Sequence, residues 1–332
     1  MKHFRKILFP FALLYGFAVF LRNKLFDLGV FSSKSYTFPV VCVGNLNVGG
    51  TGKSPMVELL IKLLKDRKKI AVLSRGYKRE TNGFFLLTGK ETAAQVGDEP
   101  LQFKTKFPEI AVAVDENRQR GIEKLRQLQT PPEVVLLDDA FQHRKVRAGL
   151  NILLTAYGDL YCDDFLLPAG NLREQRSGAA RADIVVVTKC PEKLTLEGQQ
   201  QIKKKLGLKE NQQLFFSTIG YSSSVLNGEI SRKLADLGFF TLVTGIANPK
   251  PLSDFLHSMN LDFNHLEFSD HHRFKDSELE NLRKKKRIVT TEKDFMRLKN
   301  ELSKEQLFFL PIKTEISDHV KFEEMVKVFA GN

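Results

Sequence analysis

Short apolar runs alternate with stretches of helical periodicity along most of this chain. Runs of strand length, rich in valine, leucine and isoleucine, begin near residues 38, 69, 109, 133, 150 and 182. Between several of them, as at 53–69 and 116–129, apolar residues recur at the spacing of an amphipathic helix. Runs that are apolar throughout are typical of parallel strands covered on both faces. The pattern therefore predicts an α/β fold with a doubly wound parallel sheet.

The alternating pattern breaks once and then starts again. Residues 219–231 are polar and turn-rich, and a new α/β pattern follows from residue 239 to a closing helical stretch at 322–330. A chain of 332 residues is long enough for two domains. We therefore expect an N-terminal helix at 1–30, a core domain at 31–218, a linker at 219–232 and a smaller C-terminal α/β domain at 233–332.

The N-terminal segment is an aromatic, apolar run between basic residues. Cations stand before and after about fifteen apolar residues, namely Lys2, Arg5, Lys6, Arg22 and Lys24. The run is shorter than the roughly 20 residues that span a bilayer. No small-residue cleavage site follows it, which opposes a signal peptide. We expect a helix that lies in the interface of an anionic membrane, with an ordinary buried helix as the alternative.

A glycine-rich turn, "VCVGNLNVGGTGKSP" at 41–55, joins the first of the predicted strands to the first of the predicted helices. In this context the backbone amides at the helix N-terminus can hold phosphate, Lys53 can reach the β- and γ-phosphates, and the Ser54 hydroxyl can bind Mg²⁺. Asn47 replaces the first glycine of the general P-loop signature, and we expect it to tolerate left-handed backbone angles. The expected nucleotide-binding residues are Asn47, Val48, Gly49, Gly50, Thr51, Gly52, Lys53 and Ser54.

Charge and cysteine content narrow the classes of partner. The formal net charge is +12 and the pI is near 9.5, which favours an anionic partner such as nucleotide phosphates or an anionic lipid surface. The basic residues are scattered and no nucleic-acid-binding motif is present, so nucleic acid is not expected. The three cysteines lack the spacing of a metal or disulfide site.

Several polar clusters near strand ends are candidates for chemistry. Asp138 and Asp139 end an apolar strand, as a Walker-B aspartate does opposite the P-loop serine. Asp98 stands at an expected helix start, where a simple N-cap is an equal alternative. His271 and His272 in "SDHHRF" are either catalytic or idle surface groups. "NLREQRSG" supplies Arg173 and Glu174, which could contact phosphoryl oxygens and metal or form a surface ion pair.

Taken together, these motifs carry a resemblance. The segments "GNLNVGGTGKSP", "SRGYKR", "GDEP", "DDAFQHR", "LREQRSG", "SDHHRF" and "TTEKDFMRL", in this order, resemble the tetraacyldisaccharide 4′-kinase family. The resemblance implies ATP- and Mg²⁺-dependent phosphorylation of the 4′-hydroxyl of a tetraacylated glucosamine disaccharide 1-phosphate, a lipid. It also implies a P-loop NTPase-like core, a two-stranded linker and location at the cytoplasmic face of the bacterial inner membrane.

The resemblance assigns roles to residues of this chain. Asp98 and His271 match the family's catalytic pair, in which the carboxylate accepts the sugar proton and the imidazole supports it. Ser54, Asp138, Asp139 and Glu174 are expected around the metal. Arg173 is expected at the transferring phosphoryl group, and Arg75 and Arg118 at phosphates of nucleotide or substrate. The chain departs from the family pattern at Ala140 and Gln175, which concern loop shape more than chemistry.

A rival class is the membrane-associated ATPase switch with a deviant P-loop. Those switches carry a lysine that reaches across a dimer, whereas this chain has Val48 at that position. A GTPase reading is weaker, because Pro191 stands where the guanine-binding aspartate would be. A lipid-binding module with a vestigial nucleotide site is opposed by the intact Lys53 and Ser54.

Overall fold

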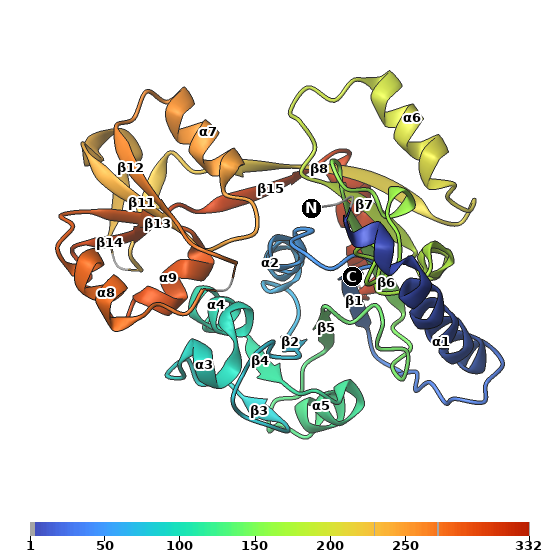
Figure 1. Ribbon diagram of the computed structural model, residues 1–332. Coiled ribbons are helices and arrows are strands. Elements are labelled where there is room, and N and C mark those ends of the chain that lie inside the picture. Colours follow the sequence, from blue (N-terminus) through green and yellow to red (C-terminus); the bar gives the residue numbers. More distant parts are fainter. Residues whose placement is uncertain (1–3, 229, 271, 332) are drawn as a thin grey trace.

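The computed structural model describes residues 4–228, 230–270 and 272–331. Two α/β lobes lie side by side, and a two-stranded ribbon runs between them (Figure 1). The larger lobe carries roughly the N-terminal two-thirds and the extreme C-terminus, and the smaller lobe carries most of the C-terminal third.

The larger lobe is built on a nine-stranded sheet in the order β15-β8-β7-β6-β1-β5-β2-β4-β3. Its seven inner strands are mutually parallel, and only the edge strands β3 and β15 run antiparallel to their neighbours. This confirms the predicted doubly wound parallel sheet. The strands are β1 (Val40–Asn45), β2 (Ile70–Ser74), β3 (Phe85–Leu86), β4 (Ala111–Val114), β5 (Val134–Asp138), β6 (Leu150–Ala156), β7 (Ile184–Thr188), β8 (Gln213–Tyr221) and β15 (Ile312–Ile316).

Helices cover both faces of this sheet. Alternate residues of β1 point to opposite faces, so Val41 and Val43 join one apolar core while Val40 and Cys42 join another. The first core includes residues of α2 (Lys53–Leu64), α4 (Asp98–Lys106) and α10 (His319–Phe329), and the second those of α5 (Arg118–Arg126) and α6 (Leu196–Leu206). Shorter helical turns are α3 (Ala93–Val96), η2 (Tyr161–Asp163) and η3 (Arg176–Arg181).

The smaller lobe has a six-stranded sheet in the order β10-β9-β14-β13-β11-β12. Its strands are β9 (Ser224–Leu226), β10 (Ser231–Lys233), β11 (Phe240–Thr244), β12 (Phe263–Glu267), β13 (Ile288–Thr290) and β14 (Leu307–Phe309). Its helices are α7 (Lys250–Ser258), α8 (Asp276–Arg283), α9 (Glu292–Leu298) and the short turn η4 (Leu234–Leu237).

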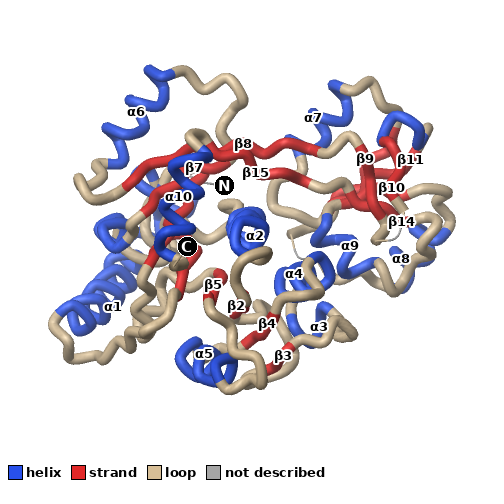
Figure 2. The backbone as a smooth tube through the Cα atoms, turned by 180° about the vertical axis from the view of Figure 1, so that it is seen from behind, coloured by secondary structure: helices blue, strands red, loops and turns tan. Residues whose placement is uncertain are grey.

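The C-terminal segment differs from its expected place in the smaller domain. β15 pairs with β8, and α10 returns to pack beside α2 in the larger lobe (Figure 2). Phe322 of α10 is buried there and meets Phe215 of β8 edge to face, with ring centroids 5.3 Å apart. The apolar residues of 322–330 are therefore covered by the larger lobe and not by the residues that immediately precede them in sequence.

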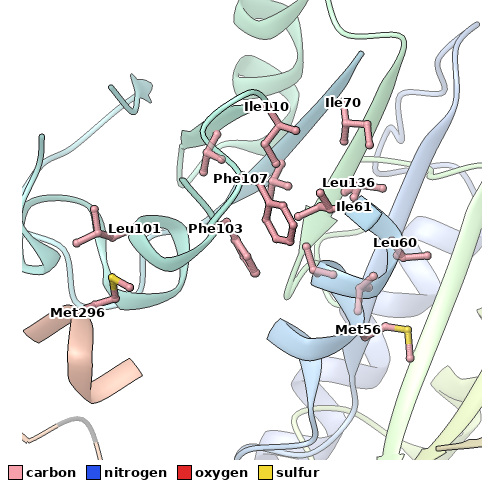
Figure 3. Packing of buried hydrophobic residues seen from close by; sticks show 14 of the residues in the cluster. Met56, Leu60, Ile61, Ile70, Leu101, Phe103, Phe107, Ile110, Leu136 and Met296 are labelled. Atoms are coloured by element: carbon pink, nitrogen blue, oxygen red, sulfur yellow. The ribbon is translucent and has the colours of Figure 1, made fainter. Parts of the chain in front are cut away.

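The two lobes share one apolar core where α9 meets α4. Met296 of α9 lies beside Leu101 of α4 (Figure 3), and both side chains are buried. The same core cluster continues into α2 through Met56 and Leu60. Helix α9 is thereby held against α4, which shares this core with α2.

The N-terminal helix α1 (Phe9–Asp27) follows a 3₁₀ turn, η1 (Phe4–Leu8), and lies outside the sheet (Figure 1). Among the helices of the described residues, only this one is long and apolar enough to cross a membrane. An 18-residue window within it has a mean hydropathy of 1.2, and 17% of that window is buried. Ala12, Gly16 and Phe26 are its buried positions. Its exposed large apolar residues are Phe9, Phe11, Leu13, Leu14, Phe17, Phe20 and Leu21.

Candidate functional site

The phosphate loop links β1 to α2 at the carboxyl edge of the larger sheet. Gly49 and Gly52 have φ values of 117° and 87°, in the left-handed region where a side chain would be strained. Gly52 is also the N-cap of α2, so the first amides of that helix open onto the loop. This arrangement forms an anion cradle from backbone groups.

Asn47 fills the missing-glycine position for a different reason than the sequence indicated. It is not among the described residues that have a positive φ. Instead it is 1% exposed, pairs with Leu172 in a β-bridge, and its Nδ2 donates to Asp164 Oδ2 over 3.1 Å. Its amide thus ties the phosphate loop to the segment that follows η2.

Lys53 and Ser54, the first two residues of α2, point into a group of carboxylates. Lys53 Nζ lies 3.3 Å from Asn45 Oδ1 and 3.8 Å from Asp139 Oδ1. The Ser54 hydroxyl is buried and donates to Glu99 Oε1 over 2.6 Å. The loop lysine and serine therefore lie together with carboxylates from two other elements.

The paired aspartates at the end of β5 differ in environment. Asp138 is fully buried, and its Oδ2 accepts from Ser74 Oγ over 2.9 Å. Burial, helped by the charges of Glu99 and Asp139, raises the pKa of Asp138 to about 7. Asp139 has a φ of 46°, a conformation that costs about 1 kcal/mol or more in a non-glycine residue. That turn directs its carboxylate to Lys53 and to Arg173, whose Nη2 lies 2.8 Å from Asp139 Oδ1.

Two lysines and one glutamate at this site were missed by the sequence analysis. Glu99 Oε1 accepts from Lys293 Nζ of α9 over 2.5 Å. Although burial opposes its ionisation, Lys293 and Lys53 hold the pKa of Glu99 well below its usual range. Lys189 Nζ donates to the carbonyl of Gly50 over 2.5 Å. "GDEP", "TKCP" and "TTEKDFMRL" contain these residues, but only the fold brings them to the phosphate loop.

The donor set fits Mg²⁺ in the company of phosphate. Asp138 Oδ1 is buried and has no hydrogen-bond partner within the described part of the chain. No group of three or more histidine, cysteine, aspartate or glutamate side chains there could hold a metal by itself. Mg²⁺ in nucleotide sites is commonly held by one or two carboxylates together with phosphates and water. The Ser54 hydroxyl with Asp138, Asp139 and Glu99 meets that requirement.

Glu174 and Arg118 have roles other than those expected. Glu174 is 1% exposed and pairs with Arg181 over 2.8 Å. Among the hydrogen bonds and ion pairs of the described residues, none joins it to Ser54, so we no longer expect it in the metal shell. Arg118 is 1% exposed and donates to the carbonyls of Asp115 and Asp138. Its guanidinium joins the ends of β4 and β5 in the interior. We therefore no longer expect Arg118 to contact substrate.

The two other expected arginines are less buried than Arg118. Arg173 Nη2 donates to the carbonyl of Asn45 over 3.1 Å and its guanidinium pairs with Asp139. Arg75, directly after β2, is exposed. Burial, together with the positive charges of Arg118 and Arg75 among others, lowers the pKa of the nearby His143 to about 4. Because its side chain is exposed, Arg75 can contact a phosphate that enters from solvent.

Asp98 is the first residue of α4 and is not its N-cap, which is Gly97. Its carboxylate pairs with Arg297 of α9, so it is held between the lobes. His271 lies outside the described residues. Burial alone would lower the pKa of Arg297, but the negative charges of Asp98, Asp294 and Asp270 outweigh burial and raise it. Asp270, the neighbour of His271, therefore acts on the same arginine as Asp98. The described neighbour of His271 is therefore within electrostatic reach of the arginine that holds Asp98.

Comparison with known proteins places these features in a family. Residues 4–329 match the tetraacyldisaccharide-1-P 4′-kinase family. The chain is 50% identical to the tetraacyldisaccharide 4′-kinase of Flavobacterium johnsoniae, over 96% of this chain and 95% of the relative. It is 47% identical to that of Bacteroides thetaiotaomicron, over 95% of this chain and 90% of the relative.

A solved structure agrees over nearly the whole chain. LpxK from Aquifex aeolicus, crystallised in complex with ATP, is 29% identical and superposes with a TM-score of 0.79, over 98% of this chain and 99% of that one. The match spans both lobes and includes the phosphate loop described above. The chain belongs to the tetraacyldisaccharide-1-P 4′-kinase family.

Proposed function

We propose that this protein transfers the γ-phosphoryl group of ATP to the 4′-hydroxyl of a tetraacylated glucosamine disaccharide 1-phosphate. The observation that carries the proposal is the convergence of Lys53, Ser54 and Asp139 at the phosphate loop of a chain that matches the kinase family over 4–329. ATP binding is supported by the related structure in complex with ATP. The bond from the sugar oxygen to Pγ forms, the bond from Pγ to the β–γ bridging oxygen breaks, and ADP leaves.

Cations of the chain stabilise the charge on the transferring group. The amides of the phosphate loop and Lys53 hold the β- and γ-phosphates, and Lys189 and Lys293 add positive charge at the same loop. Arg173 contacts the transferring phosphoryl oxygens from the side of Asp139. Ser54, Asp138, Asp139 and Glu99 would hold Mg²⁺, which would neutralise phosphate charge when bound.

The proton of the sugar hydroxyl needs an acceptor. Asp98 accepts it, and His271 supports the carboxylate from the smaller lobe. The contact between Asp98 and Arg297 supports this assignment, because it brings the start of α4 next to the segment that contains Asp270. Arg75 binds a phosphate of the nucleotide or of the lipid.

Helix α1 holds the enzyme at the cytoplasmic face of the inner membrane. Its outward apolar residues, such as Phe11 and Phe17, are more than half exposed, and its last turn carries Lys24. The acyl chains then stay in the lipid while the sugar headgroup reaches the phosphate loop. Deleting residues 1–22 should move the protein to the soluble fraction and raise KM for a long-chain lipid more than for ATP. A truncated protein that is folded and still sediments with membranes would oppose this role.

The ATPase switch is the rival that experiment must separate. Val48 is 42% exposed and has no amine that could reach a partner's nucleotide, which disfavours the switch. Purified protein in detergent micelles should transfer label from γ-labelled ATP to the lipid acceptor, and the product should carry phosphate at the 4′-position. Hydrolysis of ATP without labelled lipid would reject the kinase proposal.

A further inference from the structure

Helix α1 is bound to the segment that supplies Arg173. Three consecutive residues of that segment each make a hydrogen bond with the helix. The Tyr15 hydroxyl donates to the carbonyl of Arg173 over 2.8 Å, Asn23 Nδ2 donates to Glu174 Oε2 over 3.1 Å, and Gln175 Nε2 donates to the carbonyl of Gly16 over 2.5 Å. A helix that served only as an anchor would not need to contact each of these residues.

The packing of α1 on this segment is close. A Cβ atom on Gly16 would lie 2.6 Å from Leu166 Cδ1, so the helix approaches the loop at a position where only glycine fits without a shift. The buried positions Ala12 and Gly16 are one turn apart and face the loop, whereas the residues on the opposite side, such as Leu14 and Phe17, are exposed. One face of the helix therefore packs against the loop, and the opposite face is exposed.

The same segment is bound to the phosphate loop on its other side. The amide of Arg173 donates to the carbonyl of Leu46 over 2.8 Å, and the amide of Val48 donates to the carbonyl of Asn171 over 2.8 Å. The Arg173 side chain then reaches Asp139. Residues 171–175 therefore lie between the N-terminal helix and the loop that holds phosphate.

We propose that Tyr15 is a positioning residue for Arg173, so that α1 sets the geometry of the phosphate site in addition to contacting lipid. The inference rests on the proposed function for the role of Arg173. Burial raises the pKa of the Tyr15 phenol, so that it stays a hydrogen-bond donor at neutral pH. The hydroxyl and the Leu46 carbonyl hold the backbone of Arg173 from opposite sides, so loss of the hydroxyl should let the guanidinium shift relative to Asp139.

The test is a set of single and double variants studied in micelles. Tyr15→Phe should weaken binding of a non-hydrolysable ATP analogue and lower kcat, each by about three- to tenfold, because small displacements of a catalytic group are costly. Gln175→Ala should do the same. Tyr36→Phe is the matched control, since its buried hydroxyl has no hydrogen-bond partner within the described residues, and it should bind the analogue as the parent does. Phe17→Ser should weaken binding to anionic vesicles without changing analogue affinity.

A double-variant cycle separates positioning from general stability. In an Arg173→Ala background, Tyr15→Phe should cause no further loss, because Tyr15 acts through Arg173. Equal affinity of Tyr15→Phe and the parent, or losses that multiply in the double variant, would overturn the inference. Analogue binding needs no lipid acceptor, so a failure of lipid phosphorylation in the parent would count against the proposed function and not against this coupling.

Discussion

Arg297 of α9, in the smaller lobe, forms an ion pair with Asp98 of α4, in the larger lobe, and its Nε lies 3.0 Å from Asp98 Oδ2. The same guanidinium lies 2.8 Å from Asp294, which is fully buried. One side chain thus joins the proposed base to the second lobe and neutralises a buried carboxylate.

Replacing Arg297 should destabilise the protein. Arg297→Met leaves Asp294 and Asp98 without their cation, and a buried pair broken in this way costs about 3–5 kcal/mol. Denaturant unfolding measures the loss. Arg283→Met on α8 is the control, because its pair with Glu301 is about half exposed on both sides and should contribute less than about 1 kcal/mol. Equal losses for the two variants would contradict the account.

The proposed catalytic pair should behave as a unit. Asp98→Ala and His271→Ala should each lower kcat by about 10²-fold or more while changing KM for ATP much less. The double variant should fall short of the product of the two losses. His272→Ala should be milder, because His272 Nε2 is bound to Glu278 over 2.8 Å and its ring stacks on Phe268. Steady-state kinetics would refute the pair if the single losses multiplied.

Glu99 should influence the metal requirement. Its carboxylate accepts from the Ser54 hydroxyl, and Glu99→Gln removes the charge while keeping the shape. We expect the Mg²⁺ concentration for half-maximal activity to rise about tenfold or more. Glu109→Gln, which removes only a surface pair with Lys65, should leave it unchanged. An unchanged Mg²⁺ requirement in Glu99→Gln would show that Glu99 does not help to bind the metal.

A buried cluster between the lobes should make stability depend on pH. Lys106 Nζ lies 2.6 Å from Glu58 of α2 and 2.8 Å from Glu292 of α9, and Gln102 donates to both carboxylates. Burial, followed by the charge of Glu58, raises the pKa of Glu292 from 4.5 to about 7, despite the opposing charges of Lys106 and Lys62.

The sign of the pH effect follows from that raised pKa. The stability that the protonated Glu292 contributes is fully present below pH 4.5 and is lost as the pH rises through about 7. Glu292→Gln stays neutral, so its unfolding free energy should fall less between about pH 5 and about pH 8, by on the order of 2 kcal/mol. Parallel pH profiles for the variant and the parent would show that Glu292 does not titrate in this range.

The parts of the fold that depend on local pattern could be predicted from the sequence. The valine-rich run before Gly49 defines a strand buried on both faces, and Lys53 and Ser54 follow at fixed spacing in the turn that opens α2. Asp138 and Asp139 could be placed because parallel strands end at the same edge of a sheet.

Contacts between distant segments could not be predicted in the same way. Lys293 and Glu99 are 194 residues apart, and nothing in either local pattern specifies their pairing. Arg118 looks like any exposed helical arginine in sequence, and only the packing of α5 against the sheet buries it. The return of α10 to the larger lobe depends on the pairing of β15 with β8, and this pairing between distant segments is not specified by local sequence.

The central claim, that the phosphate loop delivers the γ-phosphoryl group, is tested most directly by Lys53→Ala. Its turnover for transfer from ATP to the tetraacyldisaccharide 1-phosphate should fall by about 10²-fold or more, because Lys53 supplies charge where it develops in the transition state. The fold should remain intact, as circular dichroism can verify, and Lys203→Ala on the exposed face of α6 should match the parent. Near-normal turnover of a folded Lys53→Ala variant would contradict the account.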